Sequence, residues 1–236
     1  VMKKEVKLGG ERKDVVVFFS DIRSFTEMAE TLEPEEVVEF LNQYMTRMVR
    51  CITRSKGIVD KYIGDAIMAV WGAPVDTGNN AFYAINAALM MRSELADFNR
   101  ERAERGKKPV HIGCGIHCGP VLSGQIGSED RMEYTVIGDT VNIASRIEAL
   151  NKAFATDILI TEETAERVKG IFRLEQMQRI KVKGKSSPMR IYAVLGRKAD
   201  HDAPKSSDEL RKFLGTESLM KRKPGTYSDA VKEEKY

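Results

Sequence analysis

The sequence has few cysteines, no long hydrophobic run and little excess charge. Three cysteines among 236 residues form no readable disulfide framework and favour a reducing, cytosolic environment. No apolar run approaches the roughly 20 residues that cross a bilayer, and the amino end does not resemble a signal peptide. A net charge of +3, from 38 basic and 35 acidic residues, argues against a nucleic-acid partner.

Length and composition predict one domain with two flanking segments. A hydrophobic content of 42% suits a chain that buries a single well-packed core. Residues 1–14 are charged and interrupted by glycine, so we expect a connector to an upstream sensor or membrane region, with the domain on the cytoplasmic side. Residues 15–196 form the predicted domain. Residues 197–236 are charged and poor in apolar residues, which predicts a flexible tail apart from one helical turn near 208–214.

Hydrophobic periodicity predicts an α+β fold. A run of β-branched and aromatic residues at 15–19 predicts a buried central strand. Further strands are expected at 58–63, 66–71, 110–117, 121–124, 133–137, 158–161, 172–182 and 190–195, with a turn at 118–120. Helices are expected at 27–30, from Pro34 to before Gly57, from Asn79 or Asn80 to about 98, at 141–150 and at 162–169. This order predicts a ferredoxin-like, palm-type sandwich: a mixed, mainly antiparallel sheet with helices on one face.

Two aspartates are the first candidates for chemistry. Asp21 follows the central strand, and Asp65 belongs to a Gly-Asp pair between two apolar runs, which is typical of a hairpin turn. Paired carboxylates without histidine or cysteine ligands suit hard cations such as Mg²⁺ or Mn²⁺, and two such ions activate hydroxyls and stabilise phosphates. The structural alternatives are a helix cap for Asp21, a turn former for Asp65 and an edge charge for the neighbouring Lys61.

Two further groups have weaker patterns. Asn142 and Arg146 are four residues apart in a predicted helix and share one face, where they stabilise an anion or form a solvated polar surface. Cys114, Cys118 and their histidine neighbours lack the spacing of a zinc site.

Four motifs, in order along the chain, resemble the class III nucleotidyl cyclase catalytic domain. Residues 19–26 (FSDIRSFT) and 60–66 (DKYIGDA) resemble its two metal motifs. Residues 117–121 (HCGPV), with Gly124 and Gly127, are similar to its glycine-containing hairpin. Residues 134–146 (YTVIGDTVNIASR) resemble its base-reading strand and catalytic helix. The resemblance covers about 15–195, and the ordered set is far more specific than any single motif.

The resemblance implies a head-to-tail homodimer with active sites at the interface. Asp21 and Asp65 of one chain, assisted by the Ile22 carbonyl, would hold two divalent cations, Mg²⁺ or Mn²⁺. The other chain would supply the remaining site residues, which are Lys61, Thr135, Asn142 and Arg146. Lys183, with Lys185 as the alternative, resembles the position that reaches the terminal phosphates.

The implied activity is adenylate cyclase, which converts ATP to 3′,5′-cyclic AMP and pyrophosphate. Lysine only donates hydrogen bonds, so Lys61 matches adenine N1 and opposes guanine N1, while the Thr135 hydroxyl can accept from the adenine amino group. Mammalian-type adenylate cyclases carry Asp in place of Thr135, so this pair resembles a bacterial subtype, and a hydroxyl that also donates softens selectivity against GTP. The rival functions are a diguanylate cyclase, whose Gly-Gly-acidic-acidic-Phe signature is absent, and a catalytically inactive regulatory cyclase domain.

Overall fold

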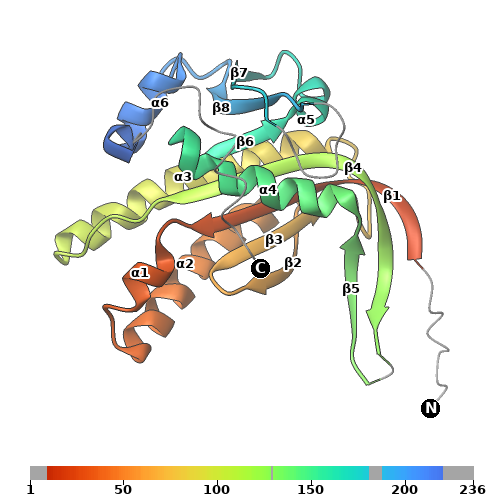
Figure 1. The fold of residues 1–236 in the computed structure, drawn as a ribbon, viewed down its shortest axis with the longest axis horizontal. Helices are drawn as coiled ribbons and strands as arrows, with labels where there is room; N and C mark the ends of the chain where they lie inside the picture. Colours follow the sequence, from red (N-terminus) through yellow and green to blue (C-terminus); the bar gives the residue numbers. More distant parts are fainter. Residues whose placement is uncertain (1–9, 129, 181–187, 220–236) are drawn as a thin grey trace.

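The structure is a computed structural model that describes residues 10–128, 130–180 and 188–219. Strands and helices are interspersed along the described residues (Figure 1). In order, the elements are β1 (Gly10–Ile22), α1 (Phe25–Ala29), α2 (Pro34–Arg54), β2 (Ile58–Ile63), β3 (Ala66–Trp71), α3 (Asn80–Glu104), β4 (Ile112–Gly127), β5 (Met132–Ile137), α4 (Asp139–Phe154), β6 (Ile158–Thr161), α5 (Glu162–Arg167), β7 (Phe172–Gln176), β8 (Ile191–Arg197), α6 (Ser207–Leu214) and a 3₁₀ turn (Glu217–Leu219).

The described strands form one mixed sheet of eight strands. Seven strands run in the order β2-β3-β1-β4-β6-β8-β7, and β5 pairs with the far half of β4. Only β4 and β6 pair in parallel, and every other pair is antiparallel. The mixed, mainly antiparallel sheet predicted from the sequence is confirmed, with β1 in its interior between β3 and β4, as expected for a strand buried on both faces.

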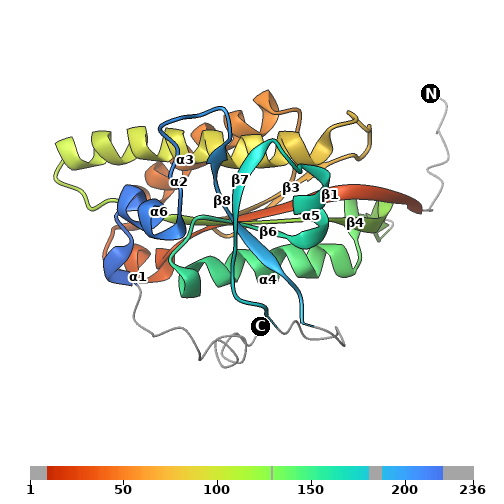
Figure 2. The same ribbon diagram turned by 90° about the horizontal axis from the view of Figure 1, so that it is seen from above.

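Helices cover both faces of this sheet, and the prediction of a single covered face was wrong. Val16 and Phe18 of β1 belong to the core beneath α2 and α3. Val17 and Phe19 point to the opposite face, where Ala144 of α4 joins their cluster. Figure 2 shows α2 and α3 on one side of the strands and α4 on the other. The period-two alternation of a strand cannot reveal which helix covers which face, because every residue of the run is apolar.

The hairpin between β2 and β3 forms as predicted. Gly64 has a φ of 62°, a left-handed conformation that costs glycine little because it has no Cβ. Asp65 follows it directly and leads into β3, whose residues are almost all buried. The turn therefore places the Asp65 carboxylate at the same end of the sheet as the last residues of β1.

Strand β4 is longer than predicted and contains no turn at 118–120. Its pairing with β1 runs unbroken from Ile112 to Gly124. The Pro120 carbonyl accepts a hydrogen bond from the Thr140 hydroxyl of α4 at 2.7 Å, so the backbone N and C=O of Pro120 face away from β1. The N–H that proline lacks is therefore not needed for pairing between β4 and β1, and the strand tolerates the proline. The end of β4 and β5 form an arm that projects from the body of the domain (Figure 1).

Both ends of the described chain are more ordered than the sequence indicates. Strand β1 begins at Gly10, inside the expected connector. After β8 the chain forms α6, whose Leu210 is fully buried. The Arg211 guanidinium donates to the Phe154 carbonyl at 3.2 Å, and the Thr216 hydroxyl donates to the Ala155 carbonyl at 3.0 Å. The segment up to Thr216 therefore packs on the domain: α6 contacts β8, and these hydrogen bonds attach it to the end of α4.

In the part of the chain that the structure describes, every helix is too short or too polar to span a bilayer.

Candidate active site

The two aspartates predicted to act together lie on neighbouring strands. Antiparallel pairing sets Ser20 of β1 opposite Ile67 of β3, so Asp21 and Asp65 come at the same end of this pair. The Asp65 carboxylate accepts a hydrogen bond from the Ile22 backbone N–H at 3.2 Å. Both aspartates are partly buried. A tight turn and a strand end therefore hold two carboxyl groups, 44 positions apart in the sequence, in one place.

The donor groups at this place fit a hard divalent cation. Asp21, Asp65 and the backbone at Ile22 offer only oxygen atoms, which Mg²⁺ and Mn²⁺ prefer. Within the described ranges, no three His, Cys, Asp or Glu side chains gather as a metal-ligand set. Tyr44 lies beneath the aspartates and is fully buried. Desolvation raises its pKa well above the usual value, and the nearby carboxylates Asp21 and Asp65 add to the effect.

A second cluster joins β2 to β5. The Thr135 hydroxyl of β5 donates to Asp60 Oδ2 at 2.8 Å. Lys61 Nζ lies 3.4 Å from Asp60 Oδ2 and 3.4 Å from Glu133 Oε2. Hydrogen bonds from Arg131 and Lys61 lower the pKa of the exposed Glu133 carboxyl. The predicted pair Lys61 and Thr135 thus belongs to one group of polar side chains, although the two residues are 74 positions apart.

Helix α4 carries the other two predicted residues. Asn142 is exposed and Arg146 is partly buried, and their spacing places them on the same face of the helix. The helix lies very close to β4: a Cβ on Gly115 would come 2.2 Å from the Glu148 backbone nitrogen. Only a residue without a side chain allows the helix backbone to approach the strand this closely. Lys183 and its alternative Lys185 lie outside the described residues.

Sequence reasoning missed Asp60. It immediately precedes Lys61, and in a regular strand adjacent side chains point to opposite faces. The register between β2 and β3 shifts between Val59 and Lys61, so Asp60 is the extra residue of a β-bulge. The only sequence signal was a second charged residue beside Lys61 in an otherwise apolar run.

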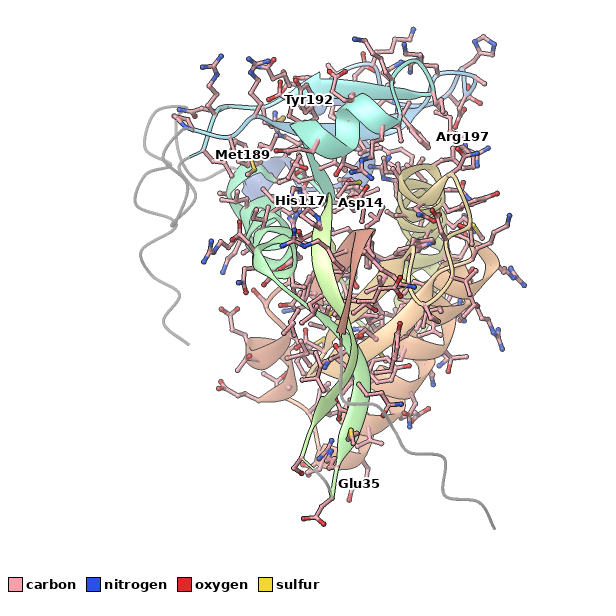
Figure 3. The ribbon with its side chains drawn as sticks, turned by 90° about the vertical axis from the view of Figure 1, so that its right-hand side faces the viewer. Asp14, Glu35, His117, Met189, Tyr192 and Arg197 are labelled. Atoms are coloured by element: carbon pink, nitrogen blue, oxygen red, sulfur yellow. The ribbon has the colours of Figure 1, made fainter. Side chains whose placement is uncertain are left out.

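The cysteine and histidine side chains near β4 belong to the core. Cys114 and Cys118 are buried free thiols, and burial raises the pKa of Cys118 to about 11. His117 is buried and its Nδ1 lies 2.8 Å from the Thr161 hydroxyl; Figure 3 labels this residue within the body of the molecule.

The fold and the site together indicate the class of protein. The domain has a palm-like sheet, the aspartate pair Asp21 and Asp65 at one end of two neighbouring strands, and a cluster that joins β2 to β5 and contains the hydrogen-bonding side chains Lys61 and Thr135. Residues 10–196 match the adenylate and guanylate cyclase catalytic domain. The chain belongs to this family.

Individual relatives include both kinds of cyclase. The chain is 42% identical to an adenylate cyclase of Anabaena cylindrica, over 76% of this chain and 36% of that protein. It is similar to the solved structure of the adenylyl cyclase CyaB from P. aeruginosa, with 36% identity, a TM-score of 0.76 and coverage of 82% and 99% of the two chains. The guanylyl cyclase Cya2 is equally similar in structure, with 33% identity, a TM-score of 0.77 and coverage of 84% and 100%.

The matched region covers 36%, 28% and 9% of the length of three curated relatives, from Anabaena cylindrica, Rhizobium meliloti and Dictyostelium discoideum. Because one fold serves relatives named for either nucleotide, the base must be argued from side chains.

Proposed function

We propose that this domain is an adenylate cyclase that converts ATP to 3′,5′-cyclic AMP and pyrophosphate. The ribose 3′-oxygen attacks the α-phosphorus and loses its proton, while the bond from the α-phosphorus to the bridging oxygen of pyrophosphate breaks. The observation that carries the proposal is the pairing of a base-facing cluster, Lys61 with Thr135, with the aspartate pair Asp21 and Asp65 in one cyclase fold.

Asp21 and Asp65, with the Ile22 carbonyl, would hold two divalent cations, Mg²⁺ or Mn²⁺. When bound, such cations lower the pKa of the attacking hydroxyl and neutralise phosphate charge. The support for this role is an oxygen-only donor set, held by a backbone hydrogen bond from Ile22 to Asp65. A donor set fixed in advance loses little conformational entropy when the ions bind.

The other polar residues act on the substrate directly. Arg146 would neutralise the charge that builds on the α-phosphoryl oxygens, an interaction that strengthens in the transition state. Asn142, one turn earlier on α4, would orient the ribose. Lys183 would bind the terminal phosphates. These assignments follow from the family resemblance and from the shared helix face of Asn142 and Arg146.

Base choice follows from hydrogen-bond polarity. The Lys61 ammonium group donates to adenine N1, which is an acceptor, whereas guanine N1 carries a hydrogen and opposes it. The Thr135 hydroxyl accepts from the adenine 6-amino group. Each mispaired polar group in a desolvated pocket lowers affinity by about 1–3 kcal/mol, so ATP is the preferred substrate.

Two copies of the chain would share each site. The β2–β3 hairpin contributes to both clusters, but Asp65 contacts β1 while Lys61 contacts β5. A head-to-tail homodimer would bring the aspartates of one copy to Lys61, Thr135, Asn142 and Arg146 of the other. In the whole protein we propose an upstream regulatory region and a cytoplasmic location for this domain.

The test is incubation of the purified chain with ATP or GTP and with Mg²⁺ or Mn²⁺, followed by identification of the product by mass. Cyclic AMP with pyrophosphate supports the proposal. A cyclic dinucleotide formed from GTP indicates a diguanylate cyclase, and no product with any combination indicates a regulatory domain.

A further inference from the structure

We propose that Asp60 sets the base selectivity of this domain by holding the Thr135 hydroxyl as a hydrogen-bond acceptor. The inference rests on the proposed function and concerns a residue in the bulge of β2. Threonine alone leaves the selectivity open, because its hydroxyl can rotate to donate to the O6 of guanine or to accept from the 6-amino group of adenine. Asp60 removes this freedom.

The bulge is what brings Asp60 to Thr135. Val59 pairs with Ala69 and Lys61 pairs with Met68, so Asp60 has no partner of its own on β3. An extra residue of this kind changes the direction in which the neighbouring side chains point. Asp60 and Lys61 thereby come to one cluster, with the Lys61 ammonium 3.4 Å from the Asp60 carboxylate.

The hydrogen bond between the two side chains has a single possible direction. The Thr135 Oγ1 atom lies 2.8 Å from Asp60 Oδ2, and a carboxylate paired with an ammonium group only accepts. The Thr135 hydroxyl therefore donates its single hydrogen to Asp60. Its lone pairs remain, and they suit the donor on C6 of adenine and oppose the acceptor on C6 of guanine.

Burial makes this arrangement rigid. The Asp60 side chain is 6% exposed, and Thr135 is 7% exposed, so water competes little for either group. Lys61 is held between Asp60 and the exposed Glu133. Asp60 is thus a positioning residue: it acts on the base through Thr135 and Lys61.

The decisive variant is Asp60→Asn, which keeps the size of the side chain but supplies an amide that can donate to Thr135. The freed hydroxyl hydrogen can then reach guanine O6. We expect the ratio of kcat/KM for ATP to that for GTP to fall about tenfold, within the range that one mispaired group produces. Asp60→Glu keeps an acceptor-only side chain and is expected to retain more of the ratio than Asp60→Asn.

A double-variant cycle separates this route from a general loss of charge. In a Thr135→Val background no hydroxyl remains, so adding Asp60→Asn is expected to change the ratio less than about twofold. Asp200→Asn makes the same chemical change at an exposed aspartate outside this cluster, and as the matched control it should keep the wild-type ratio. Thermal melting checks that each variant is folded.

The proposal is overturned if folded Asp60→Asn keeps the wild-type ratio, or if its effect persists undiminished in the Thr135→Val background. Failure of the proposed function is a different result: the wild-type chain forms no cyclic nucleotide at all. In that case calorimetric binding of ATP and GTP analogues with a non-hydrolysable α,β-bridge, in Mn²⁺, gives the same ratio from dissociation constants. A loss of ATP preference in Asp60→Asn then supports the role of Asp60, and an unchanged preference rejects it.

Discussion

At the scale of single residues, the candidate site contains two carboxylates, Asp21 and Asp65, and their positions are set by the backbone around them. Asp65 accepts a hydrogen bond from the Ile22 backbone N–H, and Asp21 is the next-to-last residue of β1. Neither side chain belongs to the buried core, so their replacement removes charge without opening a cavity. Function and stability are therefore separable at these positions.

We predict that Asp21→Asn and Asp65→Asn each lower turnover at least about a hundredfold, because each variant removes negative charge that would hold a cation. The melting temperature should change little. Asp200→Asn, at an exposed turn after β8, is the control and should retain activity. Unfolded aspartate variants would show that these residues are structural instead.

Thiol chemistry gives a second prediction at this scale. Burial raises the pKa of Cys118 to about 11 and that of Cys114 well above its usual value. Because the thiolate is the reactive form, both thiols should react with a disulfide reagent at pH 8 about a hundredfold more slowly in the native protein than in denaturant.

The raised pKa values of these two thiols also make the stability of the protein depend on pH. Unfolded thiols ionise near pH 8.5, while the folded ones hold their protons to higher pH, so their contribution to stability is present at neutral pH and is lost as the pH rises from about 9 toward 11. Urea unfolding of the wild-type chain and of Cys118→Ser at pH 7.5 and 10 measures this contribution. An equal loss in both proteins contradicts it.

At the scale of elements, the position of α4 against β4 sets where Asn142 and Arg146 lie relative to the proposed active site. The contact is backbone to backbone at Gly115, and the Thr140 hydroxyl ties the start of the helix to Pro120. Helix and strand are therefore a rigid unit that presents the two residues.

Gly115→Ala tests this contact. A Cβ would lie 2.2 Å from the Glu148 nitrogen and 2.4 Å from the Ala144 carbonyl oxygen, so α4 must shift. We predict a loss of about 1–3 kcal/mol in the free energy of unfolding, or somewhat more, together with a fall in kcat.

Gly106→Ala is the comparison variant for this prediction. Nothing lies within 4 Å of its added Cβ, and only its φ of 67° is unfavourable, at about 1–2 kcal/mol. It should keep the wild-type kcat. If both variants lose the same stability and Gly115→Ala keeps full activity, the close approach does not position α4.

At the scale of the whole molecule, the proposed homodimer would place the two half-sites of each chain in two different active sites, both shared with the same partner chain. Mixing Asp21→Ala and Arg146→Ala chains should restore activity to about a quarter of the wild-type level, because half of the randomly formed dimers carry one intact site. Asp21→Ala with Asp65→Ala is the matched control, since both changes damage the same half-site and no intact site forms. Equal activity in the two mixtures would sink the shared-site proposal.

Local patterns in the sequence by themselves determined much of the secondary structure of this protein. The apolar run of β1, the Gly64 turn and the periodicity of α2 each express preferences of a few neighbouring residues, and all three appear as predicted. The ordered motifs were enough to indicate the family, because residue types and spacing survive in a linear sequence. The aspartate pair could be predicted for the same reason: a strand end and a hairpin turn are both local features.

Tertiary structure alone decided the rest. The placement of α4 on the second face, the unbroken β4 through Pro120 and the packing of α6 all depend on contacts between segments far apart in the chain. Asp60 shows the same limit at the site. A one-residue shift in the β2–β3 register turns its side chain toward Thr135, and register is set by partner strands rather than by the residues that shift.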